Sequence, residues 1–154
     1  MKNLFAFLSI ITLLFSACKT EDITPNVQFL EHNFFGNCFT ISWDDKEVII
    51  RSEQEYNDFF VNRKQDREGC ASATPTAIDF DKYTLIGALT QTTGCSDRYE
   101  RQIDQKGNKE LTYTVKAISV GACLPLRLNM NWALIPKIKN RTDVHFEIEE
   151  AHEF

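Results

Sequence analysis

The sequence of 154 residues has no excess of positive charge and no internal repeat. It contains 17 Lys and Arg residues against 22 Asp and Glu residues, for a formal net charge of −5. Proteins that bind nucleic acid present a clustered basic face to the phosphates, and an acidic chain is not attracted to anionic lipid headgroups. We therefore expect no nucleic acid partner, and any membrane contact must come from lipid rather than from charge.

Catalytic and metal-binding motifs are also missing. The sequence contains neither His-Glu-x-x-His nor Gly-x-Ser-x-Gly, which are typical of zinc peptidases and of serine hydrolases. The three histidines, His32, His145 and His152, have no partner at metal-site spacing. These absences predict no metal and no cofactor, and they favour a role that is not enzymatic.

The apolar run at the start of the sequence is too short to cross a membrane. It covers residues 4–17, after Met1-Lys2-Asn3, whereas a membrane-spanning helix needs about 20 apolar residues. A charged start, a short apolar core and small residues before a cleavage point are typical of a secretory signal peptide. We therefore predict that residues 1–17 are a signal peptide.

The end of this run, Phe15-Ser16-Ala17-Cys18, resembles the lipobox of bacterial lipoproteins, in which Leu is commoner at the place of Phe15. In that family the signal is cut before the cysteine, which then receives a diacylglycerol on its sulfur and a third acyl chain on its amine. Because two chains already give stable anchoring, the resemblance implies an envelope lipoprotein of the outer membrane, lipidated at Cys18. An ordinary secreted protein is the alternative.

Residues 18–26 are polar and have no strand or helix periodicity, which predicts a tether between the lipid and a domain. Lys19 with Glu21-Asp22 resembles the tag that sends some Gram-negative lipoproteins to the outer face of the outer membrane. A solvated linker in a periplasm-facing lipoprotein is the alternative. Residues 27–154 are long enough for a single domain.

Four cysteines remain in this domain: Cys38, Cys70, Cys95 and Cys123. An even number in an exported chain predicts two disulfides, for which three connectivities exist. A four-cysteine zinc site is the competing interpretation, but zinc sites favour cysteines about two to four residues apart, and no two of these are that close. Oxidised cysteines also leave no thiolate to act as a nucleophile.

The residue patterns predict a mainly β fold, an antiparallel sheet or a sandwich-like domain, with one packed amphipathic helix. Residues 39–43 and 47–51, joined by Asp44-Asp45, are predicted to form a hairpin. Further strands are predicted at 84–90, 99–103, 111–120, 124–135 and 144–149.

The predicted helix begins at a capping box formed by Ser52 and Glu55. Tyr56, Phe59 and Phe60 follow at helical spacing, so one face of the helix is apolar. The polar residues 62–68 should weaken the helix, and Gly69 can end it.

The strands at 99–103 and 111–120 should be the arms of a second hairpin, and this hairpin suggests how the cysteines pair. If its turn lies near Gly107, Cys95 before the first arm faces Cys123 after the second. A disulfide requires Cα atoms within about 7 Å, which this register permits. We therefore favour Cys95–Cys123 and, with it, Cys38–Cys70.

Paired carboxylates are the remaining catalytic candidates. Glycoside hydrolysis needs two carboxyl groups about 5–9.5 Å apart. Asp44 and Asp45 suit a turn, whereas Asp79 and Asp81 stand at the mouth of a strand, where one can bond loop amides. Asp79 and Asp81 also offer oxygen ligands of the kind that calcium prefers, but without the spacing of a calcium-binding loop.

Residues 48–148 resemble the domain of the B-type lipoproteins of protease complexes. The shared features are residues 49–56 (Ile-Ile-Arg-Ser-Glu-Gln-Glu-Tyr), residues 78–87 (Ile-Asp-Phe-Asp-Lys-Tyr-Thr-Leu-Ile-Gly) and the hairpin and terminal strand that follow. That family tends to carry a Gly-Gly-Tyr type segment where this chain has Thr-Thr-Gly-Cys-Ser-Asp at 92–97. Its members are regarded as accessory, non-catalytic partners of protease complexes, so the resemblance implies a binding role.

Together these observations predict a non-enzymatic binding or accessory lipoprotein, with a protein partner favoured over a glycan. The contact surface is expected at the polar connections 70–76 and 92–97, because binding residues concentrate on such loops. Asp79, Asp81, Ser96 and Asp97 are the binding candidates. Two alternatives stay open: a hydrolase of envelope glycans or peptides that uses Asp79 or Asp81, and a structural envelope protein.

Overall fold

The computed structural model describes residues 26–31, 34–107, 110–139 and 142–153. The predicted signal peptide, Cys18, nearly all of the predicted tether and His32 lie outside the described residues. Within these ranges, no helix combines the length and the apolar character that crossing a membrane requires.

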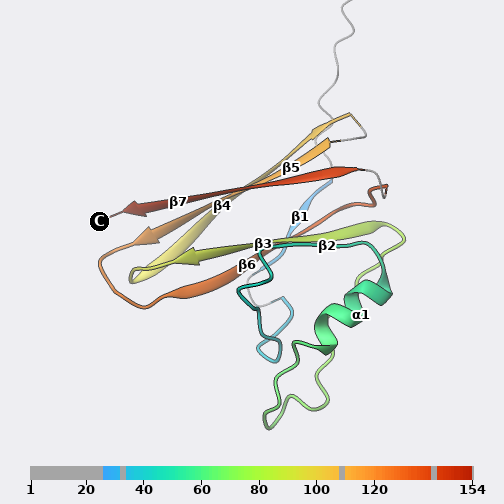
Figure 1. The fold of residues 1–154 in the computed structure, drawn as a ribbon, viewed down its shortest axis with the longest axis horizontal. Coiled ribbons are helices and arrows are strands. Elements are labelled where there is room, and N and C mark those ends of the chain that lie inside the picture. Colours follow the sequence, from blue (N-terminus) through green and yellow to red (C-terminus); the bar gives the residue numbers. More distant parts are fainter. Residues whose placement is uncertain (1–25, 32–33, 108–109, 140–141, 154) are drawn as a thin grey trace, which may run out of the picture.

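Two β-sheets stacked on each other make up most of the described chain (Figure 1). The prediction of a mainly β, sandwich-like fold is thus confirmed. The four-stranded sheet has the order β1 (Gln28–Phe29), β6 (Arg127–Pro136), β3 (Tyr83–Thr92) and β2 (Glu47–Ile50). The three-stranded sheet has the order β4 (Ser96–Lys106), β5 (Glu110–Val120) and β7 (Asp143–Glu153). The paired strands are antiparallel except β5 and β7, which run parallel.

The layer between the two sheets is apolar in one half and polar in the other. Side chains from both sheets form the apolar half: Ile86, Ala88, Ile103, Leu111, Tyr113, Val115, Ala133 and Ile135. Towards the β3–β4 turn the buried side chains are polar: Thr90, Thr92, Ser119, Asn129 and Asn131. Hydrogen bonds join this polar half internally, such as those from Asn131 Nδ2 to Thr90 Oγ1 (2.9 Å) and from Thr90 Oγ1 to the Asn129 carbonyl (3.1 Å).

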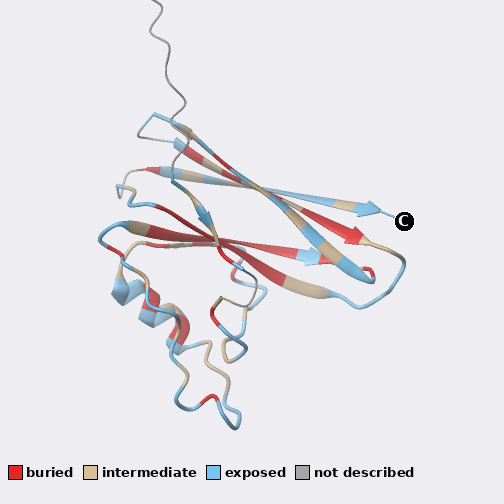
Figure 2. Ribbon diagram, turned by 180° about the vertical axis from the view of Figure 1, so that it is seen from behind, coloured by how far each residue is buried: buried red, intermediate tan, exposed pale blue. Residues whose placement is uncertain are grey.

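The opposite face of the four-stranded sheet, which we call its outer face, is covered by α1 (Glu53–Val61) and by irregular segments (Figure 1). The Ser52 hydroxyl caps α1 by accepting from the Glu55 N–H at 3.2 Å. The Glu55 carboxylate accepts from the Arg51 N–H at 2.6 Å. Figure 2 shows the consequence: α1 buries one side, β3 and β6 are largely buried, and β7 is exposed along most of its length. The helix ends at Val61, well before Gly69.

The hairpin predicted from residues 39–43 and 47–51 is wrong. β2 pairs with β3, and Phe39 forms an isolated bridge with Lys64. The turn itself is present, because the Asp45 N–H donates to the Ser42 carbonyl at 3.0 Å. The buried Asp45 side chain accepts from Arg63 after α1, and β2, which follows the turn, pairs with β3 instead of with residues 39–43.

The hairpin of β4 and β5 is confirmed, with Ser96 opposite Val120 and Lys106 opposite Glu110. Both predicted disulfides are present as well. The Cα atoms are 5.4 Å apart in Cys38–Cys70 and 4.7 Å apart in Cys95–Cys123.

Candidate functional site

A cleft of about 440 Å³ lies on the outer face of the four-stranded sheet. Its floor comes from β6, its walls come from α1 and from the irregular segment before β2, and its rim is polar. The lining side chains are Leu128, Met130 and Trp132 on the floor, Phe35, Phe39, Ile41 and Phe60 on the walls, and Asn37, Gln65 and Arg67 on the rim, with Gly36. Seven of the 11 lining residues are apolar and four of these are aromatic, but Phe35, Phe60, Met130 and Trp132 are buried beneath the surface of the cleft. Concave sites with apolar and polar lining groups are where small ligands usually bind. We call it the aromatic cleft.

The floor of the aromatic cleft depends on a glycine in the neighbouring strand. Gly87 of β3 stands opposite Trp132 of β6, and a Cβ atom at Gly87 would lie 2.6 Å from the indole ring. The glycine therefore leaves the space that the indole occupies. The ring of Phe35 meets the indole edge-to-face at 5.3 Å, and that of Phe59 does so at 5.8 Å. This packing fixes the floor in one arrangement.

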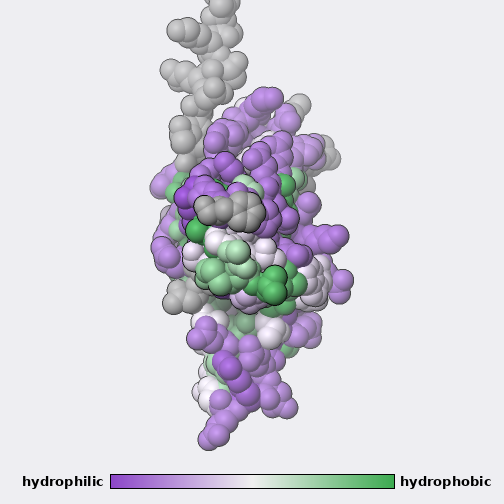
Figure 3. All heavy atoms as spheres, turned by 90° about the vertical axis from the view of Figure 1, so that its left-hand side faces the viewer, coloured by the Kyte–Doolittle hydropathy of each residue, from purple (hydrophilic) through white to green (hydrophobic). Residues whose placement is uncertain are grey.

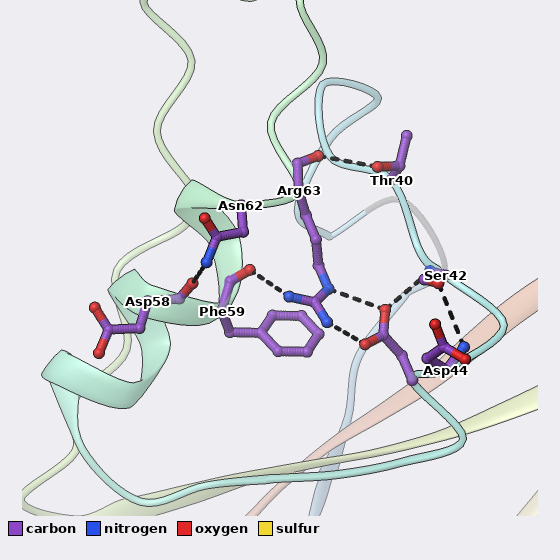
Figure 4. Close-up of polar contacts among 8 residues, drawn as sticks. Thr40, Ser42, Asp44, Asp58, Phe59, Asn62 and Arg63 are labelled. Carbon is purple, nitrogen blue, oxygen red and sulfur yellow. Dashed lines mark hydrogen bonds and ion pairs between the residues drawn. The ribbon is translucent and has the colours of Figure 1, made fainter.

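Arg63 fastens the wall of the aromatic cleft to the end of α1 (Figure 4). Its Nε donates to Asp45 Oδ2 at 2.9 Å, its Nη2 forms an ion pair with Asp45 Oδ1, and its Nη1 donates to the Phe59 carbonyl at 2.8 Å. The guanidinium carbon also lies 3.7 Å from the centre of the Phe59 ring. Burial by itself would raise the pKa of Asp45, but hydrogen bonds from Arg63 and from the Ser42 N–H, with the charge of Arg63, lower it.

The rim of the aromatic cleft is held by the first disulfide and by Arg67. Cys38–Cys70 joins the two irregular segments, and the Gln65 N–H donates to the Cys38 carbonyl at 2.8 Å. Arg67 Nη2 donates to the Asn37 carbonyl at 2.7 Å, and Arg67 Nε lies 3.3 Å from Cys70 Sγ. The guanidinium is therefore fixed at the mouth of the cleft.

An exposed apolar segment adjoins the aromatic cleft. Leu124 and Leu126 continue the alternate spacing of Leu128, Met130 and Trp132 beyond the start of β6. Their side chains are 92% and 51% exposed. Figure 3, which faces this end of the molecule, shows hydrophobic residues gathered over the β5–β6 connection between hydrophilic regions. We call residues 121–126 the tip.

The tip is braced from both sides. Cys95–Cys123 ties it to the β3–β4 turn. Arg127, directly after the tip, donates from Nη1 to the Gly94 carbonyl at 3.0 Å and from Nη2 to the Cys95 carbonyl at 3.2 Å.

Asp97 holds the polar half of the sandwich together behind the tip. Its Oδ2 accepts from Thr92 Oγ1, Tyr99 OH and Asn129 Nδ2, each at 3.0 Å. Burial by itself would raise the pKa of Asp97, but these hydrogen bonds and the charge of Arg127 lower it. Burial, together with the neighbouring Asp97, raises the pKa of Tyr99. One oxygen of the carboxylate thus joins side chains of β3, β4 and β6, which suits a bracing role.

The four predicted binding residues fall into two separate places. Asp79 and Asp81 lie before β3, whereas Ser96 and Asp97 begin β4, after β3 has ended. The 10 residues of β3 span about 30 Å. Asp79 accepts from the Asp81 N–H at 3.1 Å and pairs with Lys82 at 2.7 Å, so the hydrogen bond from Lys82 lowers its pKa. Ser96 is exposed at the start of its strand, beside the braced tip.

The predicted contact loop 70–76 is fastened along its length. Thr76 donates from Oγ1 to the Phe34 carbonyl at 3.0 Å, and its own carbonyl accepts from Tyr56 OH at 2.6 Å. Lys64 Nζ reaches the Ala71 carbonyl at 2.5 Å. This loop is therefore bonded to α1 and to the segment before β2.

No group of three or more His, Cys, Asp or Glu side chains within the described ranges could hold a metal ion. Ser119, Glu150 and His152 line a small cavity of about 70 Å³. Ser119 is buried, however, and its hydroxyl accepts from the Thr93 N–H at 3.0 Å. These contacts tie the β3–β4 turn to β5.

Comparisons with protein-family models, with curated proteins and with solved structures found no match. The resemblances to bacterial lipoproteins in general and to the B-type lipoproteins of protease complexes therefore stay predictions. Sequence reasoning also missed the aromatic cleft. Its signal was the alternation Leu126, Leu128, Met130 and Trp132 with polar residues between them, which marks one apolar strand face but not what lies over it.

Proposed function

We propose that this chain is an exported lipoprotein of the outer membrane, anchored through acyl chains on Cys18, that binds a protein partner and catalyses no reaction. The observation that supports this proposal best is the tip. Two large apolar side chains stand in solvent there, on a braced segment that adjoins an aromatic cleft. Single exposed apolar residues are ordinary, whereas a contiguous apolar patch is typical of an interaction surface.

Bracing makes the tip suitable for binding. Ordering loops and side chains on binding has an unfavourable free energy, so a segment that is already fixed in the free protein binds more tightly. The disulfide and the two Arg127 hydrogen bonds provide this order in the free protein. The half-buried Leu128, next in the same row, extends this apolar surface, and in many interfaces a few such anchors supply most of the affinity.

A pull-down in mild detergent tests this proposal. Tagged full-length protein is recovered from its own membranes, and co-purified proteins are identified by mass spectrometry. We expect one partner in near-stoichiometric amount, and its loss from a Leu124→Ser, Leu126→Ser double variant. Val61→Ser is the matched control, because Val61 is 71% exposed on α1, outside the tip and the aromatic cleft.

Two results would contradict the proposal. The first is recovery of the protein alone, after which turnover and binding of envelope glycans would be measured instead. The second is a partner that the double variant retains and the Val61→Ser variant loses.

A further inference from the structure

We propose that the edge of β7 that faces away from β5 binds an extended basic segment of a partner protein as an added β-strand. Basic side chains of this segment would lie next to Glu147 and Glu149, and apolar side chains next to Ile148. The inference goes beyond the proposed function, because it assigns a contact surface that includes neither the tip nor the aromatic cleft.

One side of β7 leaves main-chain groups available for hydrogen bonding. β7 pairs with β5 along all 11 of its residues and is the last strand of its sheet. Successive residues of a strand direct their main-chain groups to opposite sides, so about half of these groups point away from β5. Within the described residues no strand pairs with this side, and Figure 2 shows β7 exposed along most of its length. An extended peptide adds to such an edge through main-chain hydrogen bonds.

The inner face of β7, which is turned towards the four-stranded sheet, is only partly covered. Val144, Phe146 and Ile148 stand beside buried residues of β5 that belong to the apolar half of the sandwich. Val144 and Phe146 are nevertheless half-buried, and Ile148 is 39% exposed. β2 continues the four-stranded sheet beyond β3 for four residues only, against 11 residues in β7. A strand added beside β7 would cover these side chains with apolar side chains of its own.

The opposite face of β7 carries charge of one sign, because β7 contains no Lys or Arg. Alternate residues of a strand share a face, and the acidic residues on this face are Asp143, Glu147, Glu149 and Glu153. In the described parts of the chain, the ion pair that involves β7 joins Glu153 to Arg98. Lys116 of β5 stands opposite Glu149 but is paired with Glu100 of β4 at 3.5 Å.

Two carboxylates in the middle of β7 are therefore available to cations on an added strand. Glu147 is bonded to the neutral Thr114 hydroxyl at 3.2 Å, which leaves its charge unbalanced, and Glu149 lies two residues further along the same face. Oppositely charged side chains on neighbouring strands attract each other when they stand side by side, whereas like charges repel. An acidic segment would thus be rejected at this edge.

The two faces of β7 together specify the sequence pattern of the partner segment. An added strand places every second side chain beside Glu147 and Glu149 and the side chains between them beside Ile148. The segment that fits alternates Lys or Arg with apolar residues.

Two peptides test this inference on the full-length protein in mild detergent. One has the alternating order Lys-Val-Arg-Val-Lys-Val-Arg, and the other has the same composition in the order Lys-Arg-Lys-Arg-Val-Val-Val. Both carry the same fluorophore at the amino terminus and end in an amide, and binding is measured by fluorescence anisotropy. We expect the alternating peptide to bind roughly 10-fold more tightly, because the charge of the two peptides is equal and only alternation can match both faces of β7.

Amide hydrogen exchange distinguishes strand addition from charge attraction alone. Exchange is measured residue by residue by nuclear magnetic resonance, with and without the alternating peptide. We expect exchange to slow at alternate residues of β7, those whose N–H groups point away from β5, and to stay unchanged in β4, the other edge of the same sheet. Slower exchange in β4 instead of β7, or in neither strand, would overturn the inference.

Variants assign the binding to β7. Glu147→Gln together with Glu149→Gln should weaken binding of the alternating peptide roughly 2- to 30-fold, the range for two ion pairs between neighbouring strands. Glu53→Gln together with Asp58→Asn is the matched control, since it removes the same charge from exposed positions of α1, which lies on the other sheet. The control should change the affinity by less than about twofold, because screening by salt weakens the effect of distant surface charges.

Equal binding of the two peptides to the unaltered protein would overturn the inference, as would undiminished binding by the Glu147→Gln, Glu149→Gln variant. The proposed function is judged separately. The Leu124→Ser, Leu126→Ser variant should bind the alternating peptide as the unaltered protein does. If that variant loses the pull-down partner while the alternating peptide binds neither protein, protein binding through the tip stands and strand addition fails.

Discussion

The aromatic cleft and the tip are both held by a disulfide and a hydrogen-bonded aspartate, but the cleft is built from irregular segments and the tip from paired strands. Each has one disulfide and one aspartate whose pKa is lowered by its hydrogen bonds. At the tip these devices are added to strands that pair residue by residue from Ser96 to Lys106. Around the cleft they hold irregular segments together, with few main-chain hydrogen bonds such as those joining Thr40 to Arg63 and Gln65 to Cys38.

This difference shows how a small β domain can hold side chains in place where regular strand pairing stops. At the tip, the sheet fixes the backbone, and Cys95–Cys123 only restricts a short exposed connection. At the cleft, Cys38–Cys70 and the Asp45–Arg63 pair substitute for a sheet. We expect the two regions to respond differently to the same kind of change.

The largest difference should appear when an apolar side chain is removed from each region. Trp132→Ala takes a buried indole from the cleft floor and should lower the free energy of unfolding by about 3–5 kcal/mol. Leu126→Ala removes a half-exposed side chain from the tip and should change it by about 0.5 kcal/mol or less. Urea denaturation followed by circular dichroism measures both. A similar loss in the two variants would mean that the tip is part of the core.

Removing either disulfide should cost a similar free energy of unfolding, but the two variants should differ in where the structure loosens. The bridges join residues 32 and 28 apart, so the chain-entropy model assigns each about 3.6 kcal/mol. In the Cys38→Ser, Cys70→Ser variant we expect amide exchange to accelerate at 34–43 and 62–76. In the Cys95→Ser, Cys123→Ser variant, β4 and β5 should stay protected, because their pairing remains. Equal loosening of β4 and β5 would contradict the comparison.

The smallest difference concerns the two aspartates. Asp45→Asn leaves the Arg63 guanidinium without its anion, so we expect a loss of about 1–3 kcal/mol. The Asp97 side chain accepts from neutral donors, so Asp97→Asn should lower stability by about 1 kcal/mol. Unfolding free energies at pH 7 measure both losses. Equal losses would show that the charge of Arg63 adds nothing to its bond.

The same aspartates predict how stability depends on pH. Both have pKa values that are lower in the folded chain than the value of about 3.9 expected for an unfolded one. Their contribution is therefore fully present above about pH 4 to 5 and is lost as the pH falls through the folded pKa values. Each Asn variant should flatten this acid loss in a pH series. An unchanged pH profile in both variants would contradict these shifts.

The parts of the fold that local patterns determine could be predicted from the sequence. The Ser52 cap, the aromatic face of the helix and the β4–β5 hairpin each depend on residues close together in the chain. Because the hairpin register was right, the pairing of Cys95 with Cys123 followed from it. Of the binding candidates, Ser96 and Asp97 lie next to the tip, while Asp79 and Asp81 are at the far end of β3.

The parts that depend on distant partners could not be predicted. Alternation at 39–43 correctly marks Phe39 and Ile41 as apolar positions, but these side chains line the aromatic cleft instead of a hairpin. The sequence of β7 does not predict that it runs parallel to β5. The sequence also does not predict that Gly87 makes room for the Trp132 indole, because this depends on the register of β3 against β6.

The exposed edge strand β7 affects how copies of the protein can approach one another. It forms an edge of the three-stranded sheet, and an open edge can pair with the edge of another molecule and start aggregation. Five of its 11 residues are acidic: Asp143, Glu147, Glu149, Glu150 and Glu153. Two copies that approached along this edge would bring rows of carboxylates together, and charge repulsion opposes such contact. The acidic side chains of β7 therefore protect this edge against sheet-to-sheet pairing between copies of the chain.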